Sequence, residues 1–434
     1  MTDPQPSEEH PHEPHPSDTD EAAAARHLGH LGALLLDAGL SVTDVRAALE
    51  QAAETHPRTA RALTFSVLPE AVLVTKPETG TVRMFHSDAA ELSFRQSAHA
   101  SRLVHETTSA AVPLDGLPER IDRIRAMPRP HPQLSWILGS ALVAGGLATV
   151  FRCPWWAILI AMAAGGLVGI LKTILDRIES GAAIVPFVAA FVSTLVVASV
   201  ASAVGAGSVP LFGVCAPIAI LVPGALITNA LLELTATDIV TGSARLLYGL
   251  IMLGFMAGGI AAGAAVTGLR IDPDSAALVG QISSVAGSDG WQALPPLWLS
   301  WIGVVALAVG VGCAFGSGLK LTALSVGVMV CTYAVLTAAS AWVGNVVATG
   351  VSAAVLFVAA RMIERLTVAV PATISFQPAF LLLVPGTVGL VALASFDTHA
   401  LQTTPATFAS LCIGIKIGAL VAEIGTPGDR GRRA

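Results

Sequence analysis

The chain has 434 residues, of which 53% are hydrophobic and only 12% are charged, whereas an average soluble protein has about 25% charged residues. This composition excludes an ordinary soluble protein and indicates a chain that crosses a lipid bilayer several times. The net charge of -6 comes from the first 21 residues, which contain seven acidic residues and neither Lys nor Arg. The rest of the chain is close to neutral, and nucleic acid is not an expected partner.

Residues 1–25 contain many Pro, His and acidic residues and few apolar side chains, which predicts a disordered tail. His10, His12 and His15 could hold a metal weakly, but a Pro-rich acidic tail of this kind is more often a passive solvated segment, so no metal site is expected. The five cysteines show no CxxC spacing, so neither a zinc site nor a disulfide framework is expected. The first residues do not have the pattern of a cleavable signal peptide.

Residues 26–133 are expected to form a small cytoplasmic α+β domain. Apolar residues recur at helical spacing up to Gly39, and Ser41 with Asp44 predicts the start of a second helix. This segment has neither a Gly-rich phosphate loop nor a clustered nucleophile and base, so it is not expected to be an enzyme in its own right. Strands are predicted at 63–69 and, as a hairpin, 71–85, and further helices at 91–111 and 117–126.

Ten apolar stretches follow Pro132, each close to the ~20 residues that a helix needs to cross the ~30 Å hydrocarbon core. With residue 133 in the cytoplasm, thirteen basic residues near the predicted spans lie on the cytoplasmic side and two, Arg152 and Arg270, on the other. This asymmetry predicts that both termini are cytoplasmic. The predicted spans are 134–151, 154–175, 183–204, 209–229, 244–268, 295–316, 319–341, 344–362, 374–396 and 405–423.

The membrane part is predicted to be duplicated, because the sequence LVPG occurs at 221–224 and again at 383–386, each time in the fourth of five spans. Since five is odd, the second set crosses the bilayer in the opposite sense, as in many secondary transporters. The expected fold is therefore a mainly α membrane protein with ten transmembrane helices as two inverted five-helix repeats after the α+β domain. The expected segments are repeat 1 (134–268), an extracytoplasmic loop (269–294), repeat 2 (295–423) and a basic cytoplasmic tail (424–434).

The two LVPG sequences also predict a binding site. A helix broken inside the bilayer frees backbone amides and carbonyls, which is tolerated only inside the protein or beside a water-filled cavity. Such groups can hold the carboxylate and ammonium groups of an amino acid. Pro223, Gly224, Pro385 and Gly386 are therefore candidate substrate-binding residues. The alternative is that each Pro-Gly pair only bends its helix.

Polar residues inside or beside the spans are the other site candidates. Lys416 lies near the middle of its span, where a cation is costly unless it faces a cavity or an acid, and it is expected to bind substrate together with Asn229 and Gln377. Glu233 and Asp238 are candidates for proton coupling. The alternatives are a structural ion pair for Lys416 and a solvated helix at the cytoplasmic membrane surface for the other polar residues.

Three arginines have structural interpretations. Arg245 is expected to anchor the cytoplasmic end of its span. Arg361 and Arg365 are expected to form a charge cluster with Glu364 at the membrane surface.

The motif around the first LVPG resembles that of the threonine/serine exporter family of bacterial inner-membrane proteins, over about residues 26 to 423. The resemblance rests on the order Pro-Gly, Thr-Asn-Ala, Asp and Gly-x-x-Arg, found here at Pro223-Gly224, Thr228-Asn229-Ala230, Asp238 and Gly242 with Arg245. The chain departs from it at Leu232-Glu233, where relatives often have Arg-Asp, and at Arg46, where they have an acid.

The resemblance implies export of threonine and serine from the cytoplasm, driven by the proton gradient across the bacterial inner membrane, without a cofactor. Export of another small metabolite or a dipeptide, or a channel with the same repeats, is the alternative. No HExxH or GxSxG motif supports a membrane enzyme. The expected partners are a small amino acid, protons and the lipid bilayer, and a homo-oligomer is left open.

Overall fold

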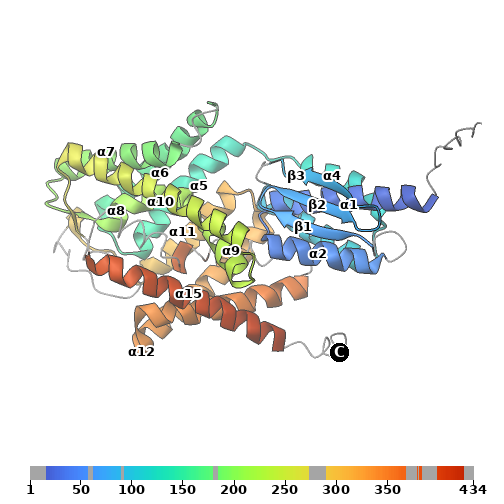
Figure 1. Cartoon of the computed structure of the whole chain (residues 1–434). Coiled ribbons are helices and arrows are strands. Elements are labelled where there is room, and N and C mark those ends of the chain that lie inside the picture. Colours follow the sequence, from blue (N-terminus) through green and yellow to red (C-terminus); the bar gives the residue numbers. More distant parts are fainter. Residues whose placement is uncertain are drawn as a thin grey trace, which may run out of the picture.

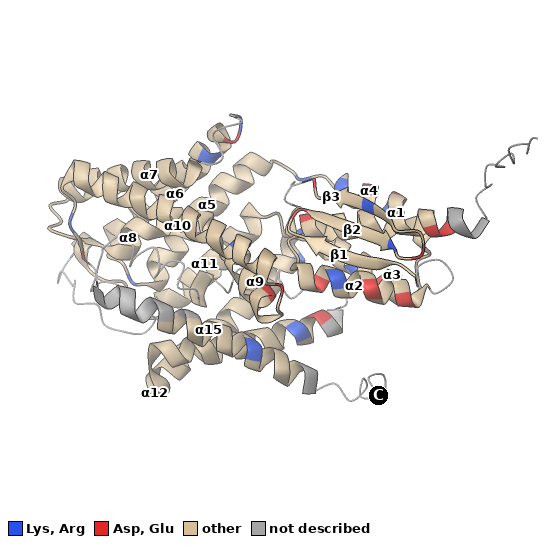
Figure 2. Cartoon of the chain, viewed as in Figure 1, with Lys and Arg blue, Asp and Glu red and all other residues tan. Residues whose placement is uncertain are grey.

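The protein consists of a block of helices and strands at one end of a group of long apolar helices (Figure 1). The structure is a computed structural model that describes residues 16–56, 62–88, 92–178, 184–272, 290–367, 379, 381–383 and 398–424. We refer to the described residues from 16 to 127 as the N-terminal block. Charged residues are concentrated on this block, whereas most of the length of the long helices is uncharged (Figure 2).

The N-terminal block contains an antiparallel sheet in the order β1-β2-β3, with helices packed around it. The predicted hairpin is confirmed, since Lys76 at the end of β2 pairs with Thr81 at the start of β3. The elements are α1 (Pro16–Asp37), α2 (Val42–Thr55), β1 (Thr64–Leu68), β2 (Ala71–Lys76), β3 (Thr81–His86), α3 (Phe94–Thr108), η1 (Leu114–Gly116) and α4 (Leu117–Arg125).

Two helix starts in the block follow from their capping residues. The Ser41 hydroxyl accepts the amide of Asp44 at 3.1 Å and so caps α2, as its sequence position predicts. Ser93 and Gln96 form a capping box at the start of α3. Both helix starts lie where the block meets the apolar helices.

Helix α1 begins at Pro16, earlier than the predicted boundary at residue 26. Ala24 and Ala25 are 2% and 8% exposed and belong to the block's own hydrophobic core. The assignment of all of residues 1–25 to a disordered tail is therefore wrong for residues 16–25. Proline suits the first helical turn and alanine is the best helix former, although neither adds much hydrophobicity to the composition.

The apolar helices correspond to most of the predicted spans. Among the described residues, five helices are long and apolar enough to cross a membrane, or six if one bent pair is counted as a span, and two further apolar helices are shorter. The count of ten stays a prediction, and most of the predicted span 374–396 lies outside the described residues. The helices are α5 (Pro132–Val150), α6 (Trp155–Leu175), α7 (Val185–Ala203), α8 (Leu211–Cys215), η2 (Ala216–Leu221), α9 (Gly224–Thr235), α10 (Ile239–Thr267), α11 (Leu299–Ala314), α12 (Gly318–Thr367) and α15 (Thr398–Ile424).

Helix α12 contains two predicted spans, 319–341 and 344–362, in one 50-residue segment. The helix is interrupted at Gly344, which has φ 75° and ψ 164°. A positive φ is easily adopted only by glycine. The interruption therefore falls at the first residue of the second predicted span, next to the predicted turn.

Helices α5 and α11 pack against each other through a contact that is symmetric. Gly139 of α5 lies against the carbonyl of Gly310 in α11, and Gly303 of α11 lies in the same way against the carbonyl of Gly146 in α5. A Cβ on any of these glycines would come closer than 3.0 Å to backbone of the other helix. Each glycine also faces a backbone amide of the other helix. The amide of Ala314 faces Gly139 as that of Val150 faces Gly303, and the amide of Leu307 faces Gly146 as that of Val143 faces Gly310.

A second contact occurs twice, once in each predicted repeat. Two glycines four residues apart on α10 lie against carbonyls of α7, and two glycines with the same spacing on α15 lie against carbonyls of α12. The pairs are Gly259 with Phe187, Gly263 with Phe191, Gly414 with Gly350 and Gly418 with Ala354. These helices are the predicted third and fifth spans of each half, so the contacts support the duplication. The inverted repeat as a whole stays a prediction.

Candidate functional site

The first LVPG sequence interrupts a helix. The segment Leu211–Leu221 and helix α9 are bent by 72° relative to each other. Pro223 has φ -76° and ψ 58°, outside the helical region, and α9 begins at the next residue, Gly224. The predicted break at Pro223-Gly224 is therefore present in the structure. The second pair, Pro385-Gly386, lies outside the described residues, as does Gln377.

Beyond the break, α9 carries the polar residues that the sequence singled out, and they meet the N-terminal block (Figure 1). The side-chain amide of Asn229 donates to the carbonyl of Gly39 at 2.9 Å. The backbone amide of Val42, in the first turn of α2, donates to Oε1 of Glu233 at 3.0 Å. A negative carboxylate is favourable at this position because the first amides of a helix are unpaired and its N-terminus is partly positive.

Asp238 binds the same segment of the block. Its Oδ2 accepts the hydroxyl of Thr43 at 2.9 Å, and its Oδ1 lies 2.9 Å from the guanidinium of Arg46. Asn229 and Glu233 thus share a face of α9, as their spacing predicts, whereas Asp238 lies beyond the end of α9, at the start of α10, and meets the same segment of the block. We call these three residues the α9 polar face.

Glu233 is completely buried and forms an ion pair with Arg245, whose side chain is 12% exposed. Arg245 thus has a buried acid as its partner, and its expected role as an anchor at the cytoplasmic end of its span stays a prediction. The two residues are twelve positions apart, on helices joined by a tight connection, and the pairing satisfies two charges that burial would otherwise penalise strongly. The second oxygen of Glu233, Oε2, is buried and has no hydrogen-bond partner among the described residues.

Sequence reasoning missed the partners of the polar face on the block, Thr43 and Arg46. Two departures from the family pattern, at Arg46 and at Leu232-Glu233, fall on the two segments that the structure brings together. If the two departures are interpreted as changes at two segments that touch, they indicate the contact between the start of α2 and the end of α9.

The remaining charged candidates lie apart from the polar face. Arg361 pairs with Glu364 at 2.9 Å, as expected, and also contacts Asp44 of the block at 3.5 Å; the side chain of Arg365 is outside the described set. Lys416 is on α15 with its side chain exposed, and no acid among the described residues pairs with it. A role of Lys416 in substrate binding stays a prediction.

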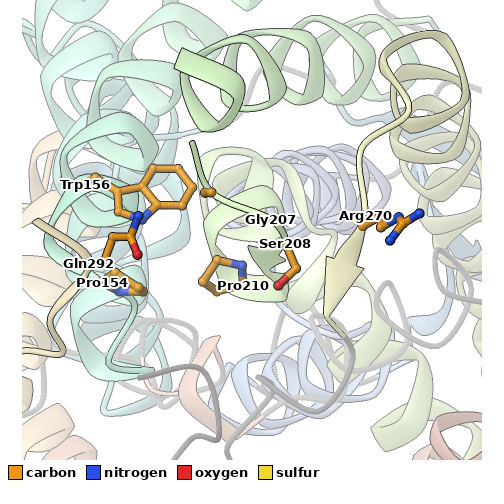
Figure 3. A pocket seen from close by; sticks show the side chains of 8 residues that line it. Pro154, Trp156, Gly207, Ser208, Pro210, Arg270 and Gln292 are labelled. Atoms are coloured by element: carbon orange, nitrogen blue, oxygen red, sulfur yellow. The ribbon is translucent and has the colours of Figure 1, made fainter. Parts of the chain in front are cut away.

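At the ends of the long helices away from the N-terminal block, a cavity of about 390 Å³ is lined by residues of the connecting turns and helix starts (Figure 3). Trp156, Pro154 and Gln292 lie on one side of it, Ser208 near the middle and Arg270 on the other side. This volume is in the range of small-molecule sites. The lining segments are those that the basic-residue pattern assigns to the extracytoplasmic side, whereas the segments touching the block are those assigned to the cytoplasm.

The assignment of the cavity and of the N-terminal block to opposite sides of the membrane predicts the result of a labelling experiment. In a cysteine-free background, we expect Gln292→Cys at the cavity to react with a membrane-impermeant thiol reagent added to whole cells. The matched control is Asp115→Cys, since the Asp115 side chain is 92% exposed on the block, and it should react only after the membrane is permeabilised. Labelling of both from outside would contradict the predicted orientation.

No group of three or more His, Cys, Asp or Glu side chains that could hold a metal occurs in the described part of the chain. The five cysteines are free. The site is therefore built from one helix break, three polar side chains and their partners on the block.

One comparison with known proteins gives a match. A family model described as "Putative threonine/serine exporter" matches residues 26–267. The match covers more than half of the chain, from α1 to the end of α10, and thus includes both the block and the helix break. Among curated proteins and solved structures, none matches the chain.

Proposed function

Because the chain belongs to the threonine/serine exporter family, we propose that it is a secondary exporter of small amino acids, threonine and serine foremost, which exchanges them for protons. Membership in a transporter family favours transport over an enzymatic reaction. The proposed location is the bacterial inner membrane, with both termini in the cytoplasm. The observation that carries the proposal is the bent span at Pro223-Gly224, which ends in the buried polar face of α9.

The substrate site proposed here lies at the break. The first amides of α9 are oriented along the helix and give its N-terminus a partial positive charge, which suits a substrate carboxylate. Asn229, one turn further along and only 7% exposed, can bind the substrate's polar groups. Pro385, Gly386, Gln377 and Lys416 are the proposed contributions of the second half.

Glu233 is the stronger of the two candidates for proton coupling. Its Oε2 is buried without a partner in the described structure, so that oxygen is free to carry a proton. Both oxygens of Asp238, by contrast, are engaged by Thr43 and Arg46. We therefore assign proton exchange to Glu233 and a supporting role to Asp238.

On the other side, the cavity near Arg270 is the proposed exit. A guanidinium attracts a carboxylate, and the indole of Trp156 and the amide of Gln292 offer further polar contacts. The symmetric contact between α5 and α11 supports the alternating movement of two related halves that such an exporter needs.

The test is transport in liposomes that contain the purified protein and labelled threonine. We expect an inwardly directed proton gradient to drive threonine out, and Glu233→Gln to retain exchange of internal for external threonine while losing gradient-driven export. Asp176→Asn is the matched control, because Asp176 is an exposed partner of Lys172 outside the site, and it should transport like wild type. Sustained electrical current with the permeant amino acid would favour a channel, and absence of threonine movement in the wild type would refute the proposed substrate.

A further inference from the structure

The N-terminal block is bonded to both halves of the membrane part. To the first half it donates the Val42 amide, the Thr43 hydroxyl and the Arg46 guanidinium, all near the start of α2. To the second half it is bonded through the start of α3, where the Phe94 amide donates to the carbonyl of Phe315 at 2.9 Å.

Two more contacts strengthen the attachment to the second half. The rings of Phe94 and Phe315 are stacked with their centroids 5.1 Å apart, and Asp44 lies 3.5 Å from Arg361 on α12. One block with its own hydrophobic core thus contacts the α9–α10 connection of the first half and both the α11–α12 turn and α12 of the second.

From this arrangement we propose that the N-terminal block is a releasable latch, which holds the two halves together at one end and covers the α9 polar face until it undocks. The proposal rests on the proposed transport function, because the movement that the latch restrains is the movement of the two halves. While the block is docked, Asn229 is 7% exposed and Glu233 is 0% exposed. A substrate therefore cannot reach these side chains from that end.

The composition of the contact is what makes it releasable. The block and the long helices have separate hydrophobic cores, and only Phe94 and Ala98 of the block belong to the core of the helices. The contact consists mainly of hydrogen bonds and partly exposed ion pairs, which contribute little individually and are weakened by salt. Relative movement of two domains is the default unless their interface is large and hydrophobic.

A disulfide across the contact provides the test. A Cβ on Gly316 would lie 3.2 Å from the Cβ of Ser93, close to the separation of about 3.5–4.5 Å in disulfides. In a cysteine-free background, Ser93→Cys with Gly316→Cys should lock the block to the α11–α12 turn on oxidation. Because Gly316 has φ 66° and any side chain there is strained, the reference is the same variant kept reduced. We expect threonine export to fall at least tenfold when the disulfide forms and to recover when it is reduced.

The matched control is a disulfide inside the block. Thr64 and Thr75 are directly paired across β1 and β2, so Thr64→Cys with Thr75→Cys links two strands without tying the block to the helices. This disulfide should leave export unchanged. Unchanged export with the Ser93–Gly316 disulfide formed would overturn the latch, because the block would then be a static support.

A second variant loosens the contact instead of locking it. Arg46→Gln removes the ion pair to Asp238, and we expect hydrogen exchange of the Val42 amide to become at least fivefold faster and the initial export rate to rise about twofold or more. Slower export from a well-folded Arg46→Gln protein would refute the latch. The exchange measurement does not depend on transport, so faster exchange in a chain that moves no threonine would refute the proposed function and leave the undocking intact.

Discussion

Replacing Pro223-Gly224 by Ala-Ala is expected to abolish most threonine export while the protein still inserts into the membrane. In a helix interior, Gly and Pro cost about 1 and 3 kcal/mol relative to Ala, so the substitution favours a continuous helix in place of the 72° bend. The amides at the start of α9 would then bond within the helix and be lost to the substrate. Initial export rates in proteoliposomes measure the effect.

The control for this experiment removes the same residue types where no bend exists. Pro132 lies in the first turn of α5, and Gly254 lies on α10 with no atom within 4 Å of where its Cβ would be. The variant with Pro132→Ala and Gly254→Ala should export at the wild-type rate. Wild-type export from the Ala-Ala variant at 223–224 would show that the break does not form the site.

The second large effect is expected on stability, from Gly259→Ala or Gly414→Ala. At either position a Cβ would come closer than 3.0 Å to a backbone carbonyl of the neighbouring helix, and a backbone atom cannot move aside as a flexible side chain can. Overpacking of this kind costs about 1–3 kcal/mol or more. We expect the two variants to lower the thermal unfolding temperature of the detergent-solubilised protein by similar amounts, because the two glycines occupy matching positions.

Two other helical glycines test this explanation. Gly254 on α10 and Gly327 on α12 have nothing within 4 Å of the position that an added methyl group would take. Ala at these positions should be neutral or stabilise the protein by up to about 1 kcal/mol, because Ala has the higher helix propensity. If Gly414→Ala behaved like Gly327→Ala, the close contact between α12 and α15 would be disproved.

Local features of the fold could be predicted from the sequence because each depends on residues close together in the chain. The β2–β3 hairpin, the capped start of α2 and the break at Pro223-Gly224 are all of this kind. The early start of α1 was missed because the alanines of residues 22–25 bury little apolar surface and therefore contribute little to a hydrophobic pattern.

The sequence predicted the residues of the candidate site on the membrane helices but not their partners on the N-terminal block. Helical spacing placed Asn229 and Glu233 on one face of α9. The partners of these residues and of Asp238 lie about 190 residues away in the chain, and periodicity carries no information on such contacts. The ion pair of Arg245 with Glu233 was missed for a related reason. A basic residue at the end of a span fits the rule for membrane topology whether or not a buried acid lies beside it.

The separate hydrophobic cores of the block and the long helices have a consequence for the segment that joins them, residues 126–131. Because only Phe94 and Ala98 of the described block join the core of the helices and the other contacts described are polar, two unconnected pieces would bind each other weakly. The short linker raises the effective concentration of the block at its docking surface. Its length, as much as any side chain, thus determines what fraction of the time the block is docked.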